Sequence, residues 1–314
     1  MKKEEFPDKH PYKKSIILRD ANELTQQENE LINKADLKNL GIIEAWTANG
    51  TNKDLSYATH GLFRYFGKYP PPIASHLILN YSQEGNLIID PMCGSGTAGV
   101  ESILLNRKCI LSDVNPLSLL LSKVKTTHID NDKLVSNLKK IELYYRKLTI
   151  EEYNFEPVGL RNFNHWFLPE TIDSLRGLKR LIQEINEINV KEFFEIMFSA
   201  TVRKVSRATT QQGRLFLDVT TAKEDALETF VKQSQKGIEN LKSLNDNIQY
   251  PVEIINNDLK VGLPEKYLGS ANLVILHPPY FNAYRYSSIN SLELAWLGIN
   301  HRDINKHEIR EYFK

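Results

Sequence analysis

The sequence lacks a long hydrophobic run, and this argues against a membrane-spanning helix. No stretch of about 18 apolar residues occurs in the chain of 314 residues. The N-terminus, MKKEEFPDKHPYKK, also lacks the apolar segment of a secretion signal. We therefore expect a soluble, cytoplasmic protein.

Cysteine and net charge are also scarce. Cys93 and Cys109 are the two cysteines, too few for a disulfide-stabilised secreted domain, which favours a reduced intracellular chain. Forty Lys and Arg residues nearly balance 39 Asp and Glu residues, giving a net charge of +1. Any binding to a polyanion must therefore come from local clusters of basic side chains.

Short apolar runs and helical periods alternate in two parts of the chain. The runs that predict strands are 86–90, 108–113, 252–257 and 272–276. The periods that predict helices beside the first two runs are 73–82, 97–107 and 116–126. This alternation favours an α/β fold with a parallel sheet and helical crossovers.

These patterns divide the chain into four parts. Residues 1–57 form a polar N-terminal extension in which SIILRD predicts a short strand and the rest is expected to be helical or irregular. Residues 58–130 carry the first half of the sheet, and residues 131–248 form a long, mainly helical insert. Residues 249–314 carry the third and fourth strands, followed by helix and loop.

A glycine turn joins the first predicted strand to a helix. In DPMCGSGT, Gly94 and Gly96 permit a tight turn that brings backbone N–H groups close to a ligand. The next strand ends at Asp113, where an acid can bind ribose hydroxyls. Asp90, just before the turn, suits a cationic ligand better than a pyrophosphate. The alternative is an ordinary turn with solvated acids at the strand ends.

A second motif ends the fourth predicted strand, in LVILHPPY. Pro278 and Pro279 cannot continue the hydrogen bonding of a sheet, so the strand stops there and presents its last residues at a site.

Together these motifs resemble those of S-adenosylmethionine-dependent DNA amino-methyltransferases, which modify N6 of adenine or N4 of cytosine. DPMCGSGT resembles the first motif of that family, and HPPY resembles its Asp/Asn/Ser-Pro-Pro-Tyr motif. FRYFGKYPP resembles the segment that closes over the methionine end of the cofactor. The resemblance covers roughly residues 60–126 and 250–297. It implies a Rossmann-like methyltransferase sheet, of which four strands are visible here.

The resemblance implies S-adenosylmethionine as cofactor and no metal. Asp113 would bind the ribose hydroxyls, Asp258 would meet the adenine amino group, and the other residues would surround the methionine part. The implied cofactor-binding residues are Lys68, Tyr69, Pro70, Asp90, Pro91, Cys93, Gly94, Gly96, Asp113 and Asp258.

The resemblance also implies a catalytic role for residues 277–280. The His277 side chain and the Pro278 carbonyl would accept the N–H hydrogens of the base amine, with Pro279 fixing the backbone. Tyr280 would stack on a base flipped out of double-stranded DNA. Histidine departs from the family pattern, because it is bulky and accepts a hydrogen bond only when neutral. A working variant, an inactive site and a structural residue therefore remain open.

Basic residues of the insert are candidates for DNA contact. Arg203, Lys204, Arg207 and Arg214 lie among hydroxyl and amide side chains that could follow a phosphate backbone. A solvated helix face is the alternative. The expected function is site-specific DNA methylation in a restriction-modification or defence system. Cytosine N4 is the favoured target because NAYRYS and the insert resemble that branch.

Three alternatives stay open beside this function. They are an adenine-N6 DNA methyltransferase, an RNA amino-methyltransferase, and a cofactor-binding subunit that is inactive or half of a split enzyme. The chain ends 34 residues after Tyr280, whereas the family fold usually continues with further strands. We therefore expect the fourth strand to be an exposed apolar edge that a second polypeptide could complete.

Overall fold

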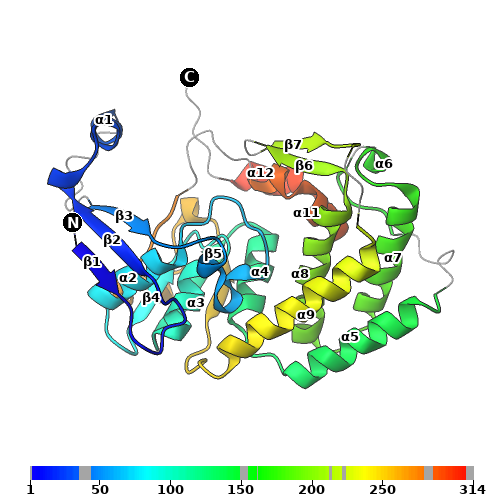
Figure 1. The fold of residues 1–314 in the computed structure, drawn as a ribbon, viewed down its shortest axis with the longest axis horizontal. Helices are drawn as coiled ribbons and strands as arrows, with labels where there is room; N and C mark the ends of the chain where they lie inside the picture. Colours follow the sequence, from blue (N-terminus) through cyan, green and yellow to red (C-terminus); the bar gives the residue numbers. More distant parts are fainter. Residues whose placement is uncertain are drawn as a thin grey trace.

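A four-stranded parallel sheet forms one body of the molecule (Figure 1). The computed structural model describes residues 2–34, 44–148, 155–160, 162–211, 214–220, 224–278 and 286–308. The strand order is β8-β5-β4-β9. The strands are β4 (Leu87–Asp90), β5 (Lys108–Asp113), β8 (Glu253–Asn256) and β9 (Leu273–Val274). The four predicted strands and the α/β class are confirmed, and the architecture is consistent with a Rossmann-like methyltransferase fold.

The sheet is buried on both faces of its central strand. Ile88 of β4 lies in one apolar cluster with Ile78 and Leu111, whereas Ile89 lies in another with Ile110 and Tyr267. Neighbouring side chains along a strand point to opposite faces, so a strand covered on both sides is a continuous apolar run. The predicted helices adjoin it as α2 (Pro71–Tyr81), α3 (Thr97–Leu104) and α4 (Pro116–Thr126).

The N-terminal segment adds a separate antiparallel sheet, in the order β1-β2-β3. Its strands are β1 (Lys2–Glu5), β2 (Ser15–Asp20) and β3 (Glu44–Ala48). The predicted strand SIILRD is β2, but the expectation of helix or irregular structure for its two partners is wrong. The sequence KKEE of β1 has no apolar alternation, so pairing with β2 rather than its own pattern makes it a strand. Short helices follow as η1 (Ala21–Glu23), α1 (Gln26–Lys34), η3 (Asp54–Ser56) and η4 (Ala58–Gly61).

Long helices form the second body, as the sequence predicts. They are α5 (Asn131–Tyr145), α7 (Pro169–Gln183), α8 (Ile188–Val205) and α9 (Ala226–Asn245). The shorter elements are α6 (Phe163–Trp166), α10 (Tyr286–Ile289), α11 (Ser291–Trp296) and α12 (His301–His307), with a ribbon of β6 (Ala208–Gln211) and β7 (Arg214–Leu217). The ribbon was not expected within the helical insert.

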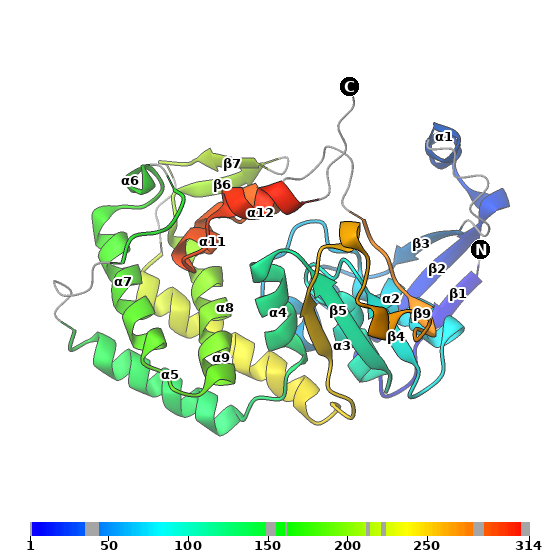
Figure 2. The ribbon, with the colours of Figure 1, turned by 180° about the vertical axis from the view of Figure 1, so that it is seen from behind.

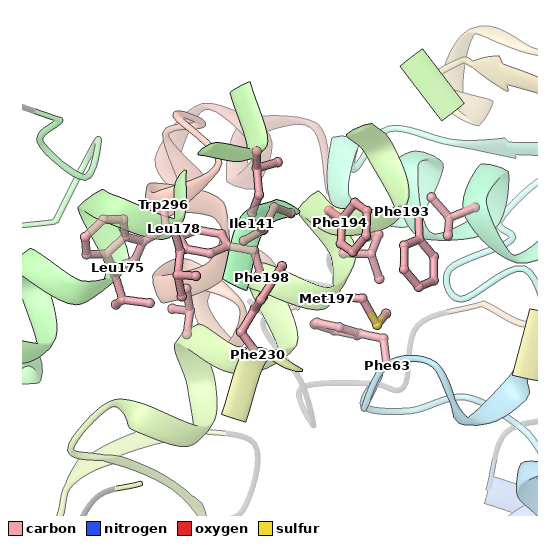
Figure 3. Close-up of a cluster of buried hydrophobic side chains, with 14 of the residues drawn as sticks. Phe63, Ile141, Leu175, Leu178, Phe193, Phe194, Met197, Phe198, Phe230 and Trp296 are labelled. Atoms are coloured by element: carbon pink, nitrogen blue, oxygen red, sulfur yellow. The ribbon is translucent and has the colours of Figure 1, made fainter. Parts of the chain in front are cut away.

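The core of the helical body is aromatic and reaches the sheet body. Figure 3 shows Phe193, Phe194, Phe198, Phe230 and Trp296 packed together. The same buried cluster contains Leu117, Leu121 and Val124 of α4, with Leu62 and Phe63 from the segment before the sheet. In the reverse view, α4 lies between the sheet and α8 (Figure 2). The two bodies therefore share one core.

The far end of the sheet is less covered. The turns η6 (Leu259–Val261) and η7 (Glu265–Tyr267) lie between β8 and β9 in the chain. Strand β9 pairs with β4, and it is the last strand in the sheet order of the described residues. Val274 and Leu276 each keep 53% of their surface exposed, as expected for an apolar edge. Among the described helices, none combines the length and the apolarity needed to cross a bilayer.

Candidate functional site

Two acids meet at the carboxyl edge of the sheet. Strands β4 and β5 are parallel and paired, so their last residues, Asp90 and Asp113, fall at the same edge. The Asp113 carboxylate accepts the N–H of Gly94 on Oδ2 at 2.9 Å and the N–H of Asn115 on Oδ1 at 2.9 Å. Burial raises the pKa of Asp113 above its ordinary value, and these N–H groups oppose the rise. Asp113 thus holds the glycine turn against the end of β5.

The glycine turn requires glycine at two positions. Gly94 and Gly96 have φ of +49° and +70°. A Cβ at Gly96 would lie 2.7 Å from Ser122 Oγ, and one at Gly94 would lie 3.2 Å from Tyr65 Cε1. Cys93 is buried within the turn, where its N–H donates to the Ser112 carbonyl at 2.9 Å. The turn is therefore closely surrounded by α4 and by the ring of Tyr65.

Asp90 is a buried carboxyl group at the start of this turn. Its residue is 1% exposed, and Oδ1 accepts the N–H of Met92 at 3.1 Å. Burial raises the pKa of Asp90 to about 7. The next residue, Pro91, is also buried. Because a nearby cation favours the carboxylate form, this position fits the positively charged methionine part of S-adenosylmethionine.

The segment 65–70 packs beside the turn. Lys68 Nζ donates to the His60 carbonyl at 3.0 Å, and Pro70 precedes α2 as its N-cap residue. The Tyr69 ring lies 5.0 Å from the His277 ring, centroid to centroid. The buried Tyr69 hydroxyl has no hydrogen-bond partner within the described ranges. This buried polar atom without a partner further supports the fit to a polar ligand.

His277 lies just beyond the end of β9. The N–H of Ile275 donates to the Ile89 carbonyl at 2.9 Å, which places residues 275–277 alongside Asp90. His277 is half-buried, and burial lowers its pKa below the ordinary value. The ring is therefore neutral at pH 7 and retains one acceptor nitrogen. Pro278 is exposed, whereas Pro279 and Tyr280 lie outside the described residues.

Asp258 follows β8 at the same edge of the sheet. The N–H of Asn257 donates to the Asp113 carbonyl at 3.2 Å, which brings the two strand ends together. Asp258 caps η6 by accepting the N–H of Lys260 at 3.0 Å and pairs with Lys260 Nζ at 3.3 Å. Burial opposes its ionisation, but these two groups hold the pKa of Asp258 below its ordinary value. The helix-capping role is thus present, and the adenine contact stays a prediction.

The four basic candidates for DNA contact differ in their surroundings. Arg203 forms a two-pronged ion pair with Glu293, at 2.8 Å from Nε and 2.7 Å from Nη2. Arg207 donates to the carbonyls of Asn164 and His165. Lys204 and Arg214 are exposed. Arg203 and Arg207 therefore hold α8 to α11 and α6, and Lys204 and Arg214 are accessible to a ligand.

Three residues near the site were not predicted. Tyr65 covers the glycine turn, with its hydroxyl 2.9 Å from Ser118 Oγ and its ring stacked on Tyr286. Lys125 is 1% exposed and donates to the Ser95 carbonyl at 2.6 Å, directly within the turn. Glu101 is fully buried on α3. Tyr65 lies in the quoted aromatic segment, whereas Lys125 and Glu101 occur in ordinary helical periods that give no signal.

Comparison with known proteins agrees with this arrangement. Residues 2–122, which include the N-terminal sheet and the glycine turn, match the N6_N4_Mtase family model, described as DNA methylase. The resemblance to N4/N6 amino-methyltransferases is confirmed. S-adenosylmethionine is the methyl donor of that family, and it is the cofactor that the sequence and the acids at the sheet edge indicate.

Three proteins similar to this chain are named type II methyltransferases. The chain is 29% identical to M.MvaI of Kocuria varians over 276 residues, which is 81% of this chain and 61% of that protein. It is 26% identical to M.BsoBI of Geobacillus stearothermophilus over 313 residues, 87% of this chain and 60% of that protein. A third relative, M.MjaII of Methanocaldococcus jannaschii, is 26% identical over 174 residues. The chain thus spans about three fifths of the first two relatives.

Proposed function

We propose that this chain forms the cofactor-binding and target-binding part of a type II DNA methyltransferase that methylates an exocyclic base amine, with cytosine N4 as the target. The convergence of Asp90, the glycine turn, Asp113 and His277 at one edge of the sheet carries this proposal. The names of the relatives support a DNA substrate in a restriction-modification setting.

The acids and the glycine turn hold the cofactor in this proposal. Asp113 accepts the ribose hydroxyls with its remaining lone pairs, and Asp258 accepts from the adenine amino group. Asp90 stabilises the positive charge of the methionine part, while Pro91, Cys93, Gly94 and Gly96 surround it. Lys68, Tyr69 and Pro70 close over the same end. Bound S-adenosylmethionine supplies an electrophilic methyl group on sulfur.

His277 and Pro278 position the base amine. The neutral imidazole and the Pro278 carbonyl accept its two N–H hydrogens, which draws the nitrogen toward tetrahedral geometry and directs its lone pair at the methyl group. The amine loses one proton on methylation, and the unprotonated nitrogen of His277 can receive it. Pro279 fixes the carbonyl, and Tyr280 stacks on the flipped base. Positioning of the two reactants contributes much of the rate.

The exposed basic residues of the ribbon and of α8 contact DNA phosphates in this proposal. Lys204 and Arg214 supply the direct contacts, and Arg203 and Arg207 fix the backbone that carries them.

We further propose that a second polypeptide completes the sheet beside β9. The exposed apolar side chains of Val274 and Leu276, on the last strand of the described sheet, support an additional strand. Co-purification of a second chain that is lost in the double variant Val274→Lys and Leu276→Lys supports this proposal. A stable monomer that is fully active contradicts it.

A second candidate is a subunit that binds S-adenosylmethionine without transferring its methyl group. The replacement of the family's Asp, Asn or Ser by His277 favours this candidate, because the ring is bulkier than those side chains. The other candidates are an adenine-N6 DNA methyltransferase and an RNA amino-methyltransferase, which differ from the first in the base that they modify.

One experiment separates these functions. Calorimetric titration with S-adenosylmethionine is performed on the wild type and on Asp113→Ala, followed by tritium transfer to unmethylated DNA and to RNA. Saturable binding that Asp113→Ala abolishes, with transfer to DNA, supports the enzyme. Mass spectrometry of the digested product then distinguishes N4-methylcytosine from N6-methyladenine. Binding without transfer favours the inactive subunit, and absence of binding contradicts both.

A further inference from the structure

Glu101 on α3 is a buried carboxylate that receives four hydrogen bonds. His10 Nε2 lies 2.9 Å from Oε2, and Ser75 Oγ donates to the same oxygen. His60 Nε2 lies 2.6 Å from Oε1, and the Tyr57 hydroxyl donates to it at 2.7 Å. The side chains of His10, His60 and Glu101 are at most 1% exposed. A buried charge is stable only when its lone pairs are satisfied in this way.

The two histidines each direct Nε2 at the Glu101 carboxylate. His10 Nδ1 accepts the N–H of Tyr12 at 3.2 Å, so the ring proton is on Nε2 and points to Glu101. Burial lowers the pKa of His60 to about 4, so this ring is also neutral at pH 7. Burial opposes ionisation of Glu101, but the hydrogen bonds from His10 and His60 hold the pKa of its carboxyl at about 2. The carboxylate is thus a fixed anchor for several donors.

These donors belong to separate parts of the chain. His10 lies between β1 and β2, Tyr57 and His60 lie in or beside η4, and Ser75 lies on α2. None of these residues belongs to the proposed cofactor site. Glu101 therefore joins the N-terminal sheet to the 57–60 segment and to both helices that flank the site.

Two lysines, the half-buried Lys68 and the buried Lys125, extend this network toward the proposed cofactor site. The His60 carbonyl accepts Lys68 Nζ at 3.0 Å, next to Tyr69 and Pro70. Thr59 Oγ donates to the Lys125 carbonyl at 2.9 Å. Lys125 Nζ in turn donates to the Ser95 carbonyl of the glycine turn. Hydrogen bonds of His60, its chain neighbour Thr59 and Lys125 thus connect the anchor to the two segments proposed to surround the methionine part.

We propose that Glu101 and His10 are positioning residues for cofactor binding. The N-terminal segment that carries His10 is then required for full cofactor affinity, although it does not contact the cofactor. Through His60, the anchor sets the place of Lys68, Tyr69 and Pro70 relative to the glycine turn. This inference rests on the proposed function. It assigns a role in affinity to residues that do not touch the cofactor.

The test compares His10→Ala with His10→Gln and with His76→Ala. His76 is a histidine of α2 that is 4% exposed, close in burial to His10, but it bonds to Asn80 and lies outside the Glu101 network. The dissociation constant for S-adenosylmethionine is measured at a temperature where each variant is folded. We expect His10→Ala to weaken binding about tenfold, His10→Gln to restore most of it through its amide N–H, and His76→Ala to change it less than twofold.

Hydrogen exchange of the ligand-free proteins provides a readout that does not depend on the cofactor. We expect His10→Ala to lose amide protection in residues 57–70 and 93–97, whereas His76→Ala does not. An unchanged dissociation constant, or unchanged protection in these segments, overturns the inference and leaves the proposed function intact. Loss of protection in a protein whose wild type binds no S-adenosylmethionine contradicts the proposed function and a role in affinity, but it establishes the structural link.

Discussion

In the proposed cofactor site, the buried Asp90 carboxyl would link cofactor binding to pH. Because its pKa is about 7, the group is a mixture of the free acid and the carboxylate at neutral pH. A cationic ligand binds the carboxylate more tightly, so binding must release a proton whenever Asp90 begins protonated. We expect the affinity for S-adenosylmethionine to rise from pH 6 to pH 8, by calorimetry. Asp90→Asn should weaken binding and flatten this dependence. An equally steep pH dependence in the variant would exclude Asp90 as its source.

The same residue also affects stability. Because the folded pKa lies above the unfolded value of 3.8, the folded state retains its proton more readily, and stability falls as pH rises from about 4 to 7. Ionised Asp90 then costs roughly 4 kcal/mol at most above pH 7. We expect Asp90→Asn to increase the free energy of unfolding at pH 8 but not at pH 4, measured by urea denaturation of the ligand-free protein.

In the proposed function, the protonation state of His277 controls the transfer rate. Burial lowers its pKa, so the acceptor nitrogen is present at pH 7 and is lost only in more acidic solution. We expect the transfer rate of the wild type to fall only in solution more acidic than the ordinary histidine pKa, as the ring takes up a proton. His277→Ala should reduce kcat about 100-fold, as loss of one positioned hydrogen-bonding group does elsewhere. Its dissociation constant for S-adenosylmethionine should be unchanged. His277→Asn, which restores a family acceptor, should retain activity without the acidic limb.

At the scale of elements, the close approach of α4 to the glycine turn leaves little room for a side chain at Gly96. A Cβ at this position would lie 2.7 Å from Ser122 Oγ, at a φ of +70°. Gly298 is a matched control, because its φ is +84° but nothing lies within 4 Å of its Cβ position. We expect Gly298→Ala to cost about 1 kcal/mol from backbone strain alone. Gly96→Ala should lower the free energy of unfolding by about 1–3 kcal/mol and should also weaken the binding of the cofactor. Equal losses in both variants would argue against the close contact.

The predictability of each element followed its physical environment. Strands β4 and β5 are covered on both faces, so their apolar runs identify them without knowledge of the fold. The strand KKEE could not be recognised, because its partner determines its conformation. The hydrogen bonds to Glu101 could not be predicted from the sequence either, since their donors are 26 to 91 residues away in the chain. Sequence patterns report local periodicity, and contacts of this separation leave no such pattern.

At the scale of the whole molecule, the proposed DNA binding would depend on a few exposed cations of an almost neutral chain. The net charge is +1, and Arg203 is already paired with Glu293. We expect DNA affinity to fall as the salt concentration rises. The plot of the logarithm of the association constant against the logarithm of the salt concentration should be less steep by about 1 for Lys204→Ala or Arg214→Ala. Lys242→Ala, which removes a lysine from the far end of α9, is the control. An unchanged slope in all three variants would place the DNA contact on another surface.

The shared core limits how the two bodies can move. Leu117, Leu121 and Val124 of α4 lie in the same buried cluster as Phe193 and the other aromatics of the helical body. A hinge opening between the bodies would expose these side chains to water, at about 25 cal/mol for each Å² of apolar surface. We therefore expect the described parts of the two bodies to move as one rigid unit, without hinge closure. If the chain acts on a flipped base as proposed, the deformability of the DNA, rather than closure of the protein, would limit the rate at which the base reaches the sheet edge.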